Sequence, residues 1–249
     1  MKIMNPGIYF YEDEFDSKKL KRLERAARLC YKSKTGAKDI ESFLRDKCDA
    51  GHESVIEHEK VTLYFVCDRG ISHEIVRHRV GSYSQESTRY CNYSNDKHNN
   101  RLTFINIPEE LFHNKKSYNS WVTCLKVAED SYLDMIKEGT KPQIARSILP
   151  HSVKTEIAIT YNIREWRHFF KLRCDKAAHP QMRQIATRAL QIFKEKYPAL
   201  FADILVPEDN TIHTEKVWIY SAQNDDQLDQ FIDEFINGDK SDIQSTLNI

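Results

Sequence analysis

Two segments of the chain repeat their apolar side chains every second residue, whereas several others repeat theirs every third or fourth residue. The segments VTLYFVC (61–67) and 156–163 show the shorter period. A period of two predicts a β-strand with one buried face, and a period near 3.6 predicts an amphipathic helix. The inward face of the first strand would carry Val61, Leu63, Phe65 and Cys67. Because both patterns are interspersed, we expect an α+β fold.

Helices are predicted where the longer period meets a residue that begins or ends a helix. Ser72 would cap a helix that runs through ISHEIVRHR to Gly81. Asn162, with Glu165 three residues later, resembles a capping box. Further helices are predicted at 17–31, 120–137 and 181–196, from Pro142, and after a strand-like KVWIYSA (216–222). Their inward residues would be Leu20, Leu23, Ala27 and Cys30, then Met182, Ile185, Ala186, Ala189, Ile192 and Phe193, and finally Leu228, Phe231, Ile232, Phe235 and Ile236.

The charge is balanced overall but unevenly distributed. Lys+Arg and Asp+Glu are both 37 in the 249 residues. Residues 213–249 hold eight acidic and two basic residues, which leaves 35 basic and 29 acidic residues in 1–212. A zero net charge argues against a general nucleic-acid coat, whereas a basic body suits smaller anionic ligands. We therefore divide the chain into a body, 1–212, and an acidic appendage, 213–249.

Cysteine usage and the N-terminal segment indicate the compartment. The six cysteines lie at wide, irregular intervals without a CxxC pair, so neither a disulfide framework nor a zinc knuckle is expected. His52 and His58 are six residues apart and diverge on a helix, so GHESVIEH (51–58) does not predict a metal site. MKIMNPGIYFYEDEFD does not resemble a signal peptide, and no apolar run could cross a bilayer. A reduced, cytoplasmic protein without membrane or metal partners is expected.

The segment RHRVGSYSQESTRY (77–90) is dense in arginine and serine and contains one aliphatic side chain, Val80. On a helix, Arg77 and Arg79 would point in nearly opposite directions, whereas Glu74, Arg77 and His78 would share a face. Forked guanidinium donors and hydroxyls suit the binding of anions on two sides. The alternative is a solvated helix face followed by a loop.

Arg173 lies in REWRHFFKLRC (164–174), in the same helical register as the apolar residues Trp166, Phe169 and Phe170. A guanidinium group on a buried face needs an anion or a planar polar partner. The alternative is that Arg173 extends its charged end to solvent from the helix terminus. Arg164 and His168 are neighbours on another face of the same helix.

These segments together resemble one family. Arg77-His78-Arg79, followed after seven residues by Ser87 and then by Arg89-Tyr90, is similar to the signature of the flavin-dependent thymidylate synthases. GHES (51–54) with EH (57–58), ARSILP (145–150) and NIREWRHFFKLRCDKAAHPQ (162–181) resemble the same family in the expected order. The resemblance covers about residues 1–205. Several long motifs in order are far more specific than any one of them.

The resemblance implies a fold and an activity. The fold would be a mixed or antiparallel sheet flanked by helices, with 1–212 as a single catalytic domain. The protein would be a homotetramer with FAD bound in active sites between subunits. It would convert dUMP to dTMP by reductive methylation, with methylenetetrahydrofolate as the carbon donor and NADPH as the reductant.

The resemblance also implies the site residues, position by position. The FAD contacts would be Ser54, Arg77, His78, Arg79, Gln85, Asn162, Arg164 and His168, with His52 and His179 near the ring. The dUMP contacts would be Glu74, Arg77, Gln85, Glu86, Ser87, Thr88, Arg89, Arg146 and Arg173. Arg173 would be the catalytic residue, at the N3 and O2 edge of the uracil ring.

Three positions depart from the family's usual residues: Glu74 replaces a glutamine, Ser84 an asparagine and Gln85 a glutamate. The spacing from Arg173 to His179 is also one residue longer than in some members. Two rival hypotheses are a non-catalytic nucleotide-binding protein and a nucleic-acid-binding protein. Arg89, Arg146 and Arg173 argue against the first. The second is disfavoured because the aromatic residues lie in apolar stripes and do not alternate with arginines.

Overall fold

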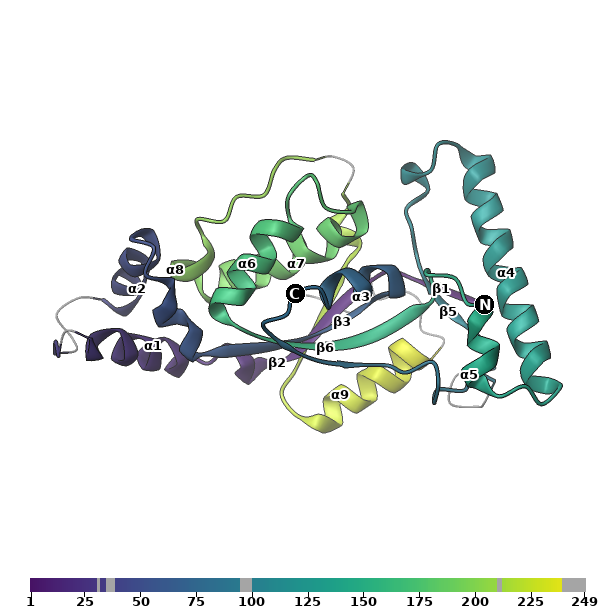
Figure 1. The fold of residues 1–249 in the computed structure, drawn as a ribbon, viewed down its shortest axis with the longest axis horizontal. Coiled ribbons are helices and arrows are strands. Elements are labelled where there is room, and N and C mark those ends of the chain that lie inside the picture. The colour runs from purple at the N-terminus through teal and green to yellow at the C-terminus, as the bar shows by residue number, and fades with distance from the viewer. Residues whose placement is uncertain (31, 35–38, 95–99, 210–211, 239–249) are drawn as a thin grey trace.

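The computed structural model describes residues 1–30, 32–34, 39–94, 100–209 and 212–238. A five-stranded mixed sheet runs through its centre in the order β4-β6-β3-β2-β7, and β1 and β5 form a separate parallel pair (Figure 1). The strands are β1 (Lys2–Met4), β2 (Gly7–Tyr11), β3 (Lys60–Asp68), β4 (Ser82–Gln85), β5 (Thr103–Ile105), β6 (Lys154–Asn162) and β7 (Trp218–Ala222). The predicted α+β class is confirmed.

Helices account for most of the remaining chain. The α-helices are α1 (Lys18–Leu29), α2 (Ile40–Asp49), α3 (Arg69–Ile75), α4 (Lys115–Lys137), α5 (Pro142–Ala145), α6 (Ile163–Arg173), α7 (Pro180–Lys196), α8 (Pro198–Phe201) and α9 (Asp225–Phe231). Shorter helical turns are η1 (Glu12–Phe15), η2 (Glu53–His58), η4 (Glu109–Leu111), η5 (Arg146–Ile148), η6 (Thr214–Lys216) and the π-helical η7 (Ile232–Asn237). Among the described residues, no helix combines the length and apolarity needed to cross a bilayer.

The two longest strands confirm the alternation seen in the sequence. β3 and β6 pair antiparallel along nine residues each, from Lys60 opposite Asn162 to Asp68 opposite Lys154. The predicted inward residues Val61, Leu63, Phe65 and Cys67 are all buried. Asn162 ends β6 and caps α6, because its side chain accepts a hydrogen bond from the backbone N–H of Glu165 at 2.8 Å. The strand therefore delivers the chain directly into α6.

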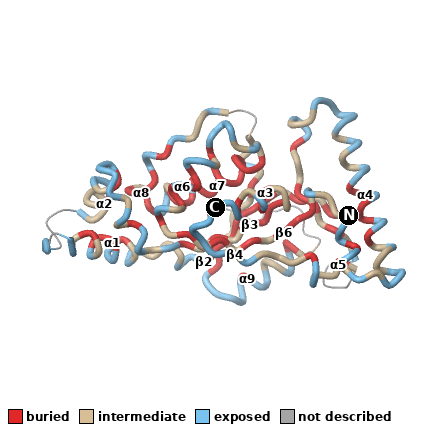
Figure 2. Tube along the Cα trace, viewed as in Figure 1, coloured by how far each residue is buried: buried red, intermediate tan, exposed pale blue. Residues whose placement is uncertain are grey.

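Helices α6 and α7 cover one face of the sheet, and α9 lies on the opposite face (Figure 1). Buried residues follow the sheet and the sides of α6 and α7 that face it, whereas much of α4 and α9 is exposed (Figure 2). Trp166, Phe169 and Phe170 are fully buried in this core. The indole N–H of Trp166 donates to the carbonyl of Val61 at 3.0 Å and so ties α6 to β3. Truncating one such aromatic side chain would cost about 3–5 kcal/mol.

The described part of the acidic segment contributes one strand, β7, to the sheet. β7 pairs in parallel with β2, and Trp218 lies so close to Gly7 that a Cβ there would come within 1.9 Å of the indole ring. Lys2 then donates from Nζ to the carbonyls of Phe235, Ile236 and Gly238 at 2.8–3.0 Å. The boundary at 212 stays a prediction, but residues 218–222 form an edge strand of the sheet.

Two predicted helix details were wrong. α3 begins at Arg69, where the side chain of Asp68 accepts from the N–H of Ile71, and it ends at Ile75 well before Gly81. Arg77 and His78 therefore lie in a turn, and the helical argument for their directions does not apply. The predicted inward Cys30 lies just beyond α1 and is exposed, because the apolar face ends with Ala27.

Candidate active site

Arg173 and His78 meet where the end of α6 approaches the turn after α3. The Nε of Arg173 donates to Nε2 of His78 at 3.0 Å. Its two terminal nitrogens donate to the carboxylate and the carbonyl of Glu74, at 3.0 and 2.9 Å. The side chain is 19% exposed, so Arg173 lies at the margin of the core. The predicted need for an anionic partner is met by Glu74, one of the three departures.

The contacts of His78 fix its protonation. Nδ1 lies 3.1 Å from a carboxylate oxygen of Glu165, while Nε2 accepts from Arg173. Burial, the Arg173 guanidinium and the nearby His168 ring lower the pKa of His78 to about 4. Burial raises the pKa of Glu165. His78 is therefore neutral at pH 7, with its proton on Nδ1 directed at Glu165.

A groove lies beside this group, along one side of α6. Its volume is about 430 Å³, which is within the range of small-molecule sites. Its lining comes from α6, η2, the end of β6 and Val80, and comprises Glu53, Glu57, Val80, Asn162, Arg164, Glu165, His168 and Lys171. Three predicted flavin residues, Asn162, Arg164 and His168, are thus brought together. Arg164 is paired with Glu57, so an incoming anion would have to displace that carboxylate.

His78, Glu165 and His168 place ligand-type atoms within 4.8 Å of one another. A metal ion would have to bind a nitrogen of His78, and both nitrogens already face hydrogen-bonding partners. The Arg173 guanidinium beside Nε2 would also repel a cation. We therefore infer that Glu165 and His168 hold the neutral imidazole of His78 in place and do not bind a metal ion.

The predicted substrate loop, residues 85–89, begins at the end of edge strand β4. Just before β4, Gly81 passes so close to Tyr161 that a Cβ would lie 2.3 Å from its ring. Gln85 then donates to the hydroxyls of Ser72 and Thr155, at 2.8 and 3.1 Å. An amide can donate both bonds, whereas the glutamate common in the family could only accept. The departure at Gln85 thus has a local structural reason.

Arg146 belongs to the same end of the sheet. Its guanidinium donates to the hydroxyl of Thr88 at 3.3 Å. Arg69 reaches the same loop and donates to the carbonyl of Glu86 at 3.4 Å. Two predicted substrate residues, Thr88 and Arg146, therefore contact one another, with a further arginine beside them.

The groove and the substrate loop lie toward opposite ends of β6. Gln85 is opposite Ile157, whereas the groove residue Asn162 ends the strand five positions later. At about 3.3 Å per residue this separation is roughly 17 Å. Glu74 and Arg173 join His78 beside the groove, and the loop with Arg146 lies toward the other end. A single chain thus divides the predicted residues into two groups.

The remaining predicted residues make few contacts within the chain. His52, Ser54, Arg77, Arg79 and Arg89 are exposed, and the guanidinium of Arg89 lies 5.2 Å from the ring of Tyr90. Ser87 accepts from the N–H of Arg89 at 3.3 Å. His179 caps α7, where its Nδ1 accepts from the N–H of Gln181 at 3.3 Å. In this chain His179 therefore has a role in helix capping.

Four lysine and arginine residues in the described chain are buried although the sequence did not single them out: Lys2, Lys154, Arg167 and Arg183. Arg167 forms two hydrogen bonds of 2.7 Å with Asp203 and a third of 3.1 Å with Glu53, and it holds η2 against α6. Its neighbours in the sequence, Trp166 and His168, did not indicate that Arg167 is buried, because a buried helix face is recognised from its apolar residues. Lys154 lies buried under the substrate loop between Glu86 and Glu156. Nothing in the sequence around Lys154 singles it out as buried.

Comparison with known proteins places this arrangement in a family. The model of the family described as thymidylate synthase complementing protein matches residues 14–199, and the chain belongs to that family. A flavin-dependent thymidylate synthase of Geobacter sulfurreducens is 34% identical over 187 residues, which cover 72% of this chain and 78% of the relative. One from Corynebacterium diphtheriae is 33% identical over 201 residues, covering 73% and 77%.

A third relative, from Pyrococcus furiosus, is also a flavin-dependent thymidylate synthase. It is 37% identical over 154 residues, which cover 61% of this chain and 62% of the relative. Family membership makes the chain an enzyme, a transferase of nucleotide biosynthesis that depends on a flavin. The matched region contains every residue assigned to the site from the sequence.

Proposed function

We propose that the chain converts dUMP to dTMP by reductive methylation, with methylenetetrahydrofolate as the carbon donor and NADPH as the reductant of bound FAD. The observation that carries this proposal is the position of Arg173, held by Glu74 and His78 beside a groove lined by Asn162, Arg164 and His168. A planar cation thus lies next to a groove of small-molecule size.

The groove residues fit a flavin dinucleotide. Arg164 and Lys171 would supply positive charge for phosphates once these displace their carboxylate partners, Glu57 and Glu53. The exposed Arg79 directly precedes the groove residue Val80. The N-terminus of the eleven-residue α6 opens on the same groove and favours an anion. We assign FAD to these residues, to His78 and to Ser54, with His52 and His179 as further candidates. When bound there, FAD would supply the hydride that is consumed in the reductive methylation.

The loop 85–89 and Arg146 suit the phosphate of dUMP. Ser87 and Thr88 offer hydroxyl groups, while Arg89 and Arg146 offer charged donors. Arg89 is exposed and stacks only on its neighbour Tyr90, so it can turn toward a ligand at little cost. We assign the nucleotide to this loop, with Arg77 as a further contact and Gln85 as the residue that fixes the start of the loop.

Arg173 is the residue we assign to the uracil ring. Three of its N–H groups bond Glu74 and His78, and the remaining ones are free to meet the N3 and O2 edge of the base. Negative charge would develop on that edge when a hydride adds to the ring at C6. A guanidinium already fixed in place stabilises this charge without reorganising, which is where such groups contribute most to rate.

Neutral His78 orients this cation. Because Nε2 accepts from Arg173 and Nδ1 faces Glu165, the imidazole transmits no positive charge toward the base. A protonated His78 could not accept the bond and would repel the guanidinium. Glu74 completes the support by holding the other side of the fork.

Assembly into a homotetramer supports a complete site. In one chain the flavin groove and the substrate loop lie toward opposite ends of β6, although the reaction requires the two ligands to touch. A second chain that supplies the loop to the groove would solve this, and we propose active sites of that kind. The six free cysteines in the described chain support a reducing compartment, and we propose the cytoplasm.

Anaerobic incubation tests the activity. Purified protein is mixed with dUMP, methylenetetrahydrofolate, FAD and NADPH, and dTMP is separated and quantified. We expect dTMP in the complete mixture and none when dUMP or NADPH is omitted. A protein that binds FAD and dUMP but yields no dTMP would instead favour a non-catalytic nucleotide-binding protein.

A further inference from the structure

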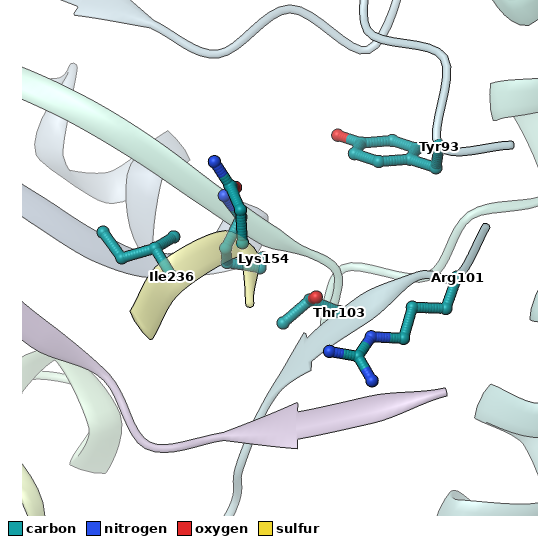
Figure 3. Close-up of a pocket in the computed structure, with 6 residues that line it drawn as sticks. Tyr93, Arg101, Thr103, Lys154 and Ile236 are labelled. Carbon is teal, nitrogen blue, oxygen red and sulfur yellow. The ribbon is translucent and has the colours of Figure 1, made fainter. Parts of the chain in front are cut away.

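Lys154, the first residue of β6, is a buried lysine held between two carboxylates. Its Nζ lies 2.6 Å from an oxygen of Glu156 and 3.1 Å from an oxygen of Glu86. Only 7% of its side chain is exposed. Figure 3 shows Lys154 at the edge of β6, with Tyr93, Thr103 and Ile236 around it. A charge taken out of water in this way needs partners of good geometry.

Each of the two carboxylates has a second partner, a tyrosine. Tyr93 donates to the other oxygen of Glu86 at 2.8 Å, and Tyr9 donates to Glu156 at 3.2 Å. Burial acts to lower the pKa of Lys154, but Glu86 and Glu156 outweigh it, so the pKa lies above its usual value. Burial and Glu86 raise the pKa of Tyr93. The group is therefore a lysine cation between two carboxylates, with neutral tyrosines as outer donors.

The space around this group is too small for a ligand. The cavity measures about 10 Å³, which admits about one water molecule. It is lined by Tyr93, Arg101, Thr103, Lys154, Ile236 and Asn237. Buried ion pairs contribute little net stability compared with apolar packing, so stability alone is a weak reason for this arrangement. The role of the Lys154 ion pairs therefore lies in the segments that Glu86 and Glu156 hold in place.

Glu86 is the second residue of the substrate loop, directly before Ser87. Its N–H donates to the carbonyl of Glu156 at 2.9 Å, and its own carbonyl accepts from Arg69 at 3.4 Å. Its carboxylate, bound by Lys154 and Tyr93, turns toward the interior and away from solvent. Main chain and side chain of Glu86 are thus both fixed where the loop leaves the sheet. The position from which residues 87–89 leave the sheet is therefore fixed.

We propose that Lys154 is a positioning residue for dUMP binding: by holding Glu86, it sets the path of the loop from which Ser87, Thr88 and Arg89 reach the nucleotide. This inference rests on the proposed dUMP site. It reassigns Glu86 from a direct contact with dUMP to the anchor of the loop. A displacement of about 1 Å in such a loop can cost about 100-fold in rate.

Lys154→Met tests the proposal, because methionine is unbranched and only one atom shorter than lysine, and it removes the charge. Flavin-loaded protein is titrated with dUMP in a calorimeter, and KM for dUMP and kcat are measured separately. We expect dUMP affinity to fall about 10- to 100-fold. KM should rise by a larger factor than kcat falls, and the flavin content per chain should stay at the parent value.

Lys2→Met is the matched control. Lys2 and Lys154 are equally buried, each with 6% of the residue exposed, but Lys2 bonds the carbonyls at the end of η7. Both variants should lower the melting temperature, whereas only Lys154→Met should weaken dUMP binding. Unchanged dUMP affinity in Lys154→Met, or an equal loss in Lys2→Met, would overturn the proposal.

Glu86→Gln is the second variant, useful if Lys154→Met does not fold. It keeps the size of the side chain and an acceptor for Tyr93, and it leaves Lys154 paired with Glu156. We expect weaker dUMP binding here too. In the double variant, Lys154→Met with Glu86→Gln, the loss of dUMP affinity should be smaller than the sum of the two single losses. Both substitutions remove the same contact, that between Lys154 and Glu86. Parent affinity in Glu86→Gln, or full additivity, would contradict the role. If the parent itself binds no dUMP, the proposed function fails instead.

Discussion

The Nε of Arg173 donates to the Nε2 of His78 at 3.0 Å, across 95 positions of the chain. This bond joins the last residue of α6 to the turn that follows α3. It requires that His78 be neutral, and the carboxylate of Glu165 at Nδ1 selects the matching tautomer. Arg173, the catalytic candidate, and His78, a flavin-binding candidate, are thus joined by a hydrogen bond. A substitution of either residue is therefore expected to affect the other.

Arg173→Ala should lower the rate of dTMP formation about 100- to 1,000-fold, because it removes a fixed cation from the developing charge on the base. FAD should still bind, since the groove residues Asn162 and Arg164 are untouched. Arg173→Lys should show most of the loss, because an ammonium group lacks the planar fork. Single-turnover rates and flavin absorbance measure both effects, with Arg25→Ala on the exposed face of α1 as the control. Parent-level activity, or loss of FAD, would show that the assignment is wrong.

His78 should make the flavin-free protein acid-sensitive. Its pKa is about 4 in the folded protein against 6.5 as the ordinary value, so the unfolded chain takes up the proton first as the pH falls. The contribution of neutral His78 to the free energy of unfolding is complete above pH 6.5 and is lost as the pH falls toward 4. Melting temperatures of the parent and of His78→Gln, measured across this range, should converge at low pH. Parallel curves would contradict the depressed pKa. Glu165, whose raised pKa acts in the opposite direction, is present in both proteins.

Ser87→Ala should weaken dUMP binding and leave measurable turnover. Ser87 Oγ accepts from the N–H of Arg89, and the described residues place no histidine or lysine at hydrogen-bonding distance to remove its proton. A serine without an adjacent base is a poor nucleophile. Calorimetric titration and the dTMP assay separate affinity from rate, with Ser84→Ala on β4, just before the loop, as the comparison. Complete loss of dTMP with parent affinity would instead make Ser87 a nucleophile.

FAD should bind only to the assembled oligomer. The groove of one chain holds about 430 Å³, and the predicted flavin residues Ser54, Arg77 and Arg79 are exposed and do not line it. We therefore expect a second chain to complete the binding surface. Sedimentation monitored at a flavin wavelength should show absorbance at the mass of the oligomer alone. A yellow monomer would refute the shared site.

Much of the local structure could be predicted from the sequence. The alternation in 61–67 predicted β3, the stripe in 181–196 predicted the buried face of α7, and Asn162 with Glu165 predicted the start of α6. These features depend on neighbours within a few residues, so periodicity and capping chemistry report them directly. The motif order likewise predicted the family.

Contacts between distant charged residues could not be predicted in this way. Nothing in the spacing of residues shows that Lys154 would lie between Glu86 and Glu156, or that Arg167 would pair with Asp203. Such pairs depend on strand register and on how helices pack, and many alternative partners have the same charge. The end of α3 at Ile75 is likewise set by contacts with residues that are distant in the sequence. His78 leaves the helical path for a buried position between Glu165 and Arg173, and those two partners come from a helix 87 and 95 residues later in the chain. Local propensity favoured a longer helix, but desolvation and pairing in the folded protein decided where it stops.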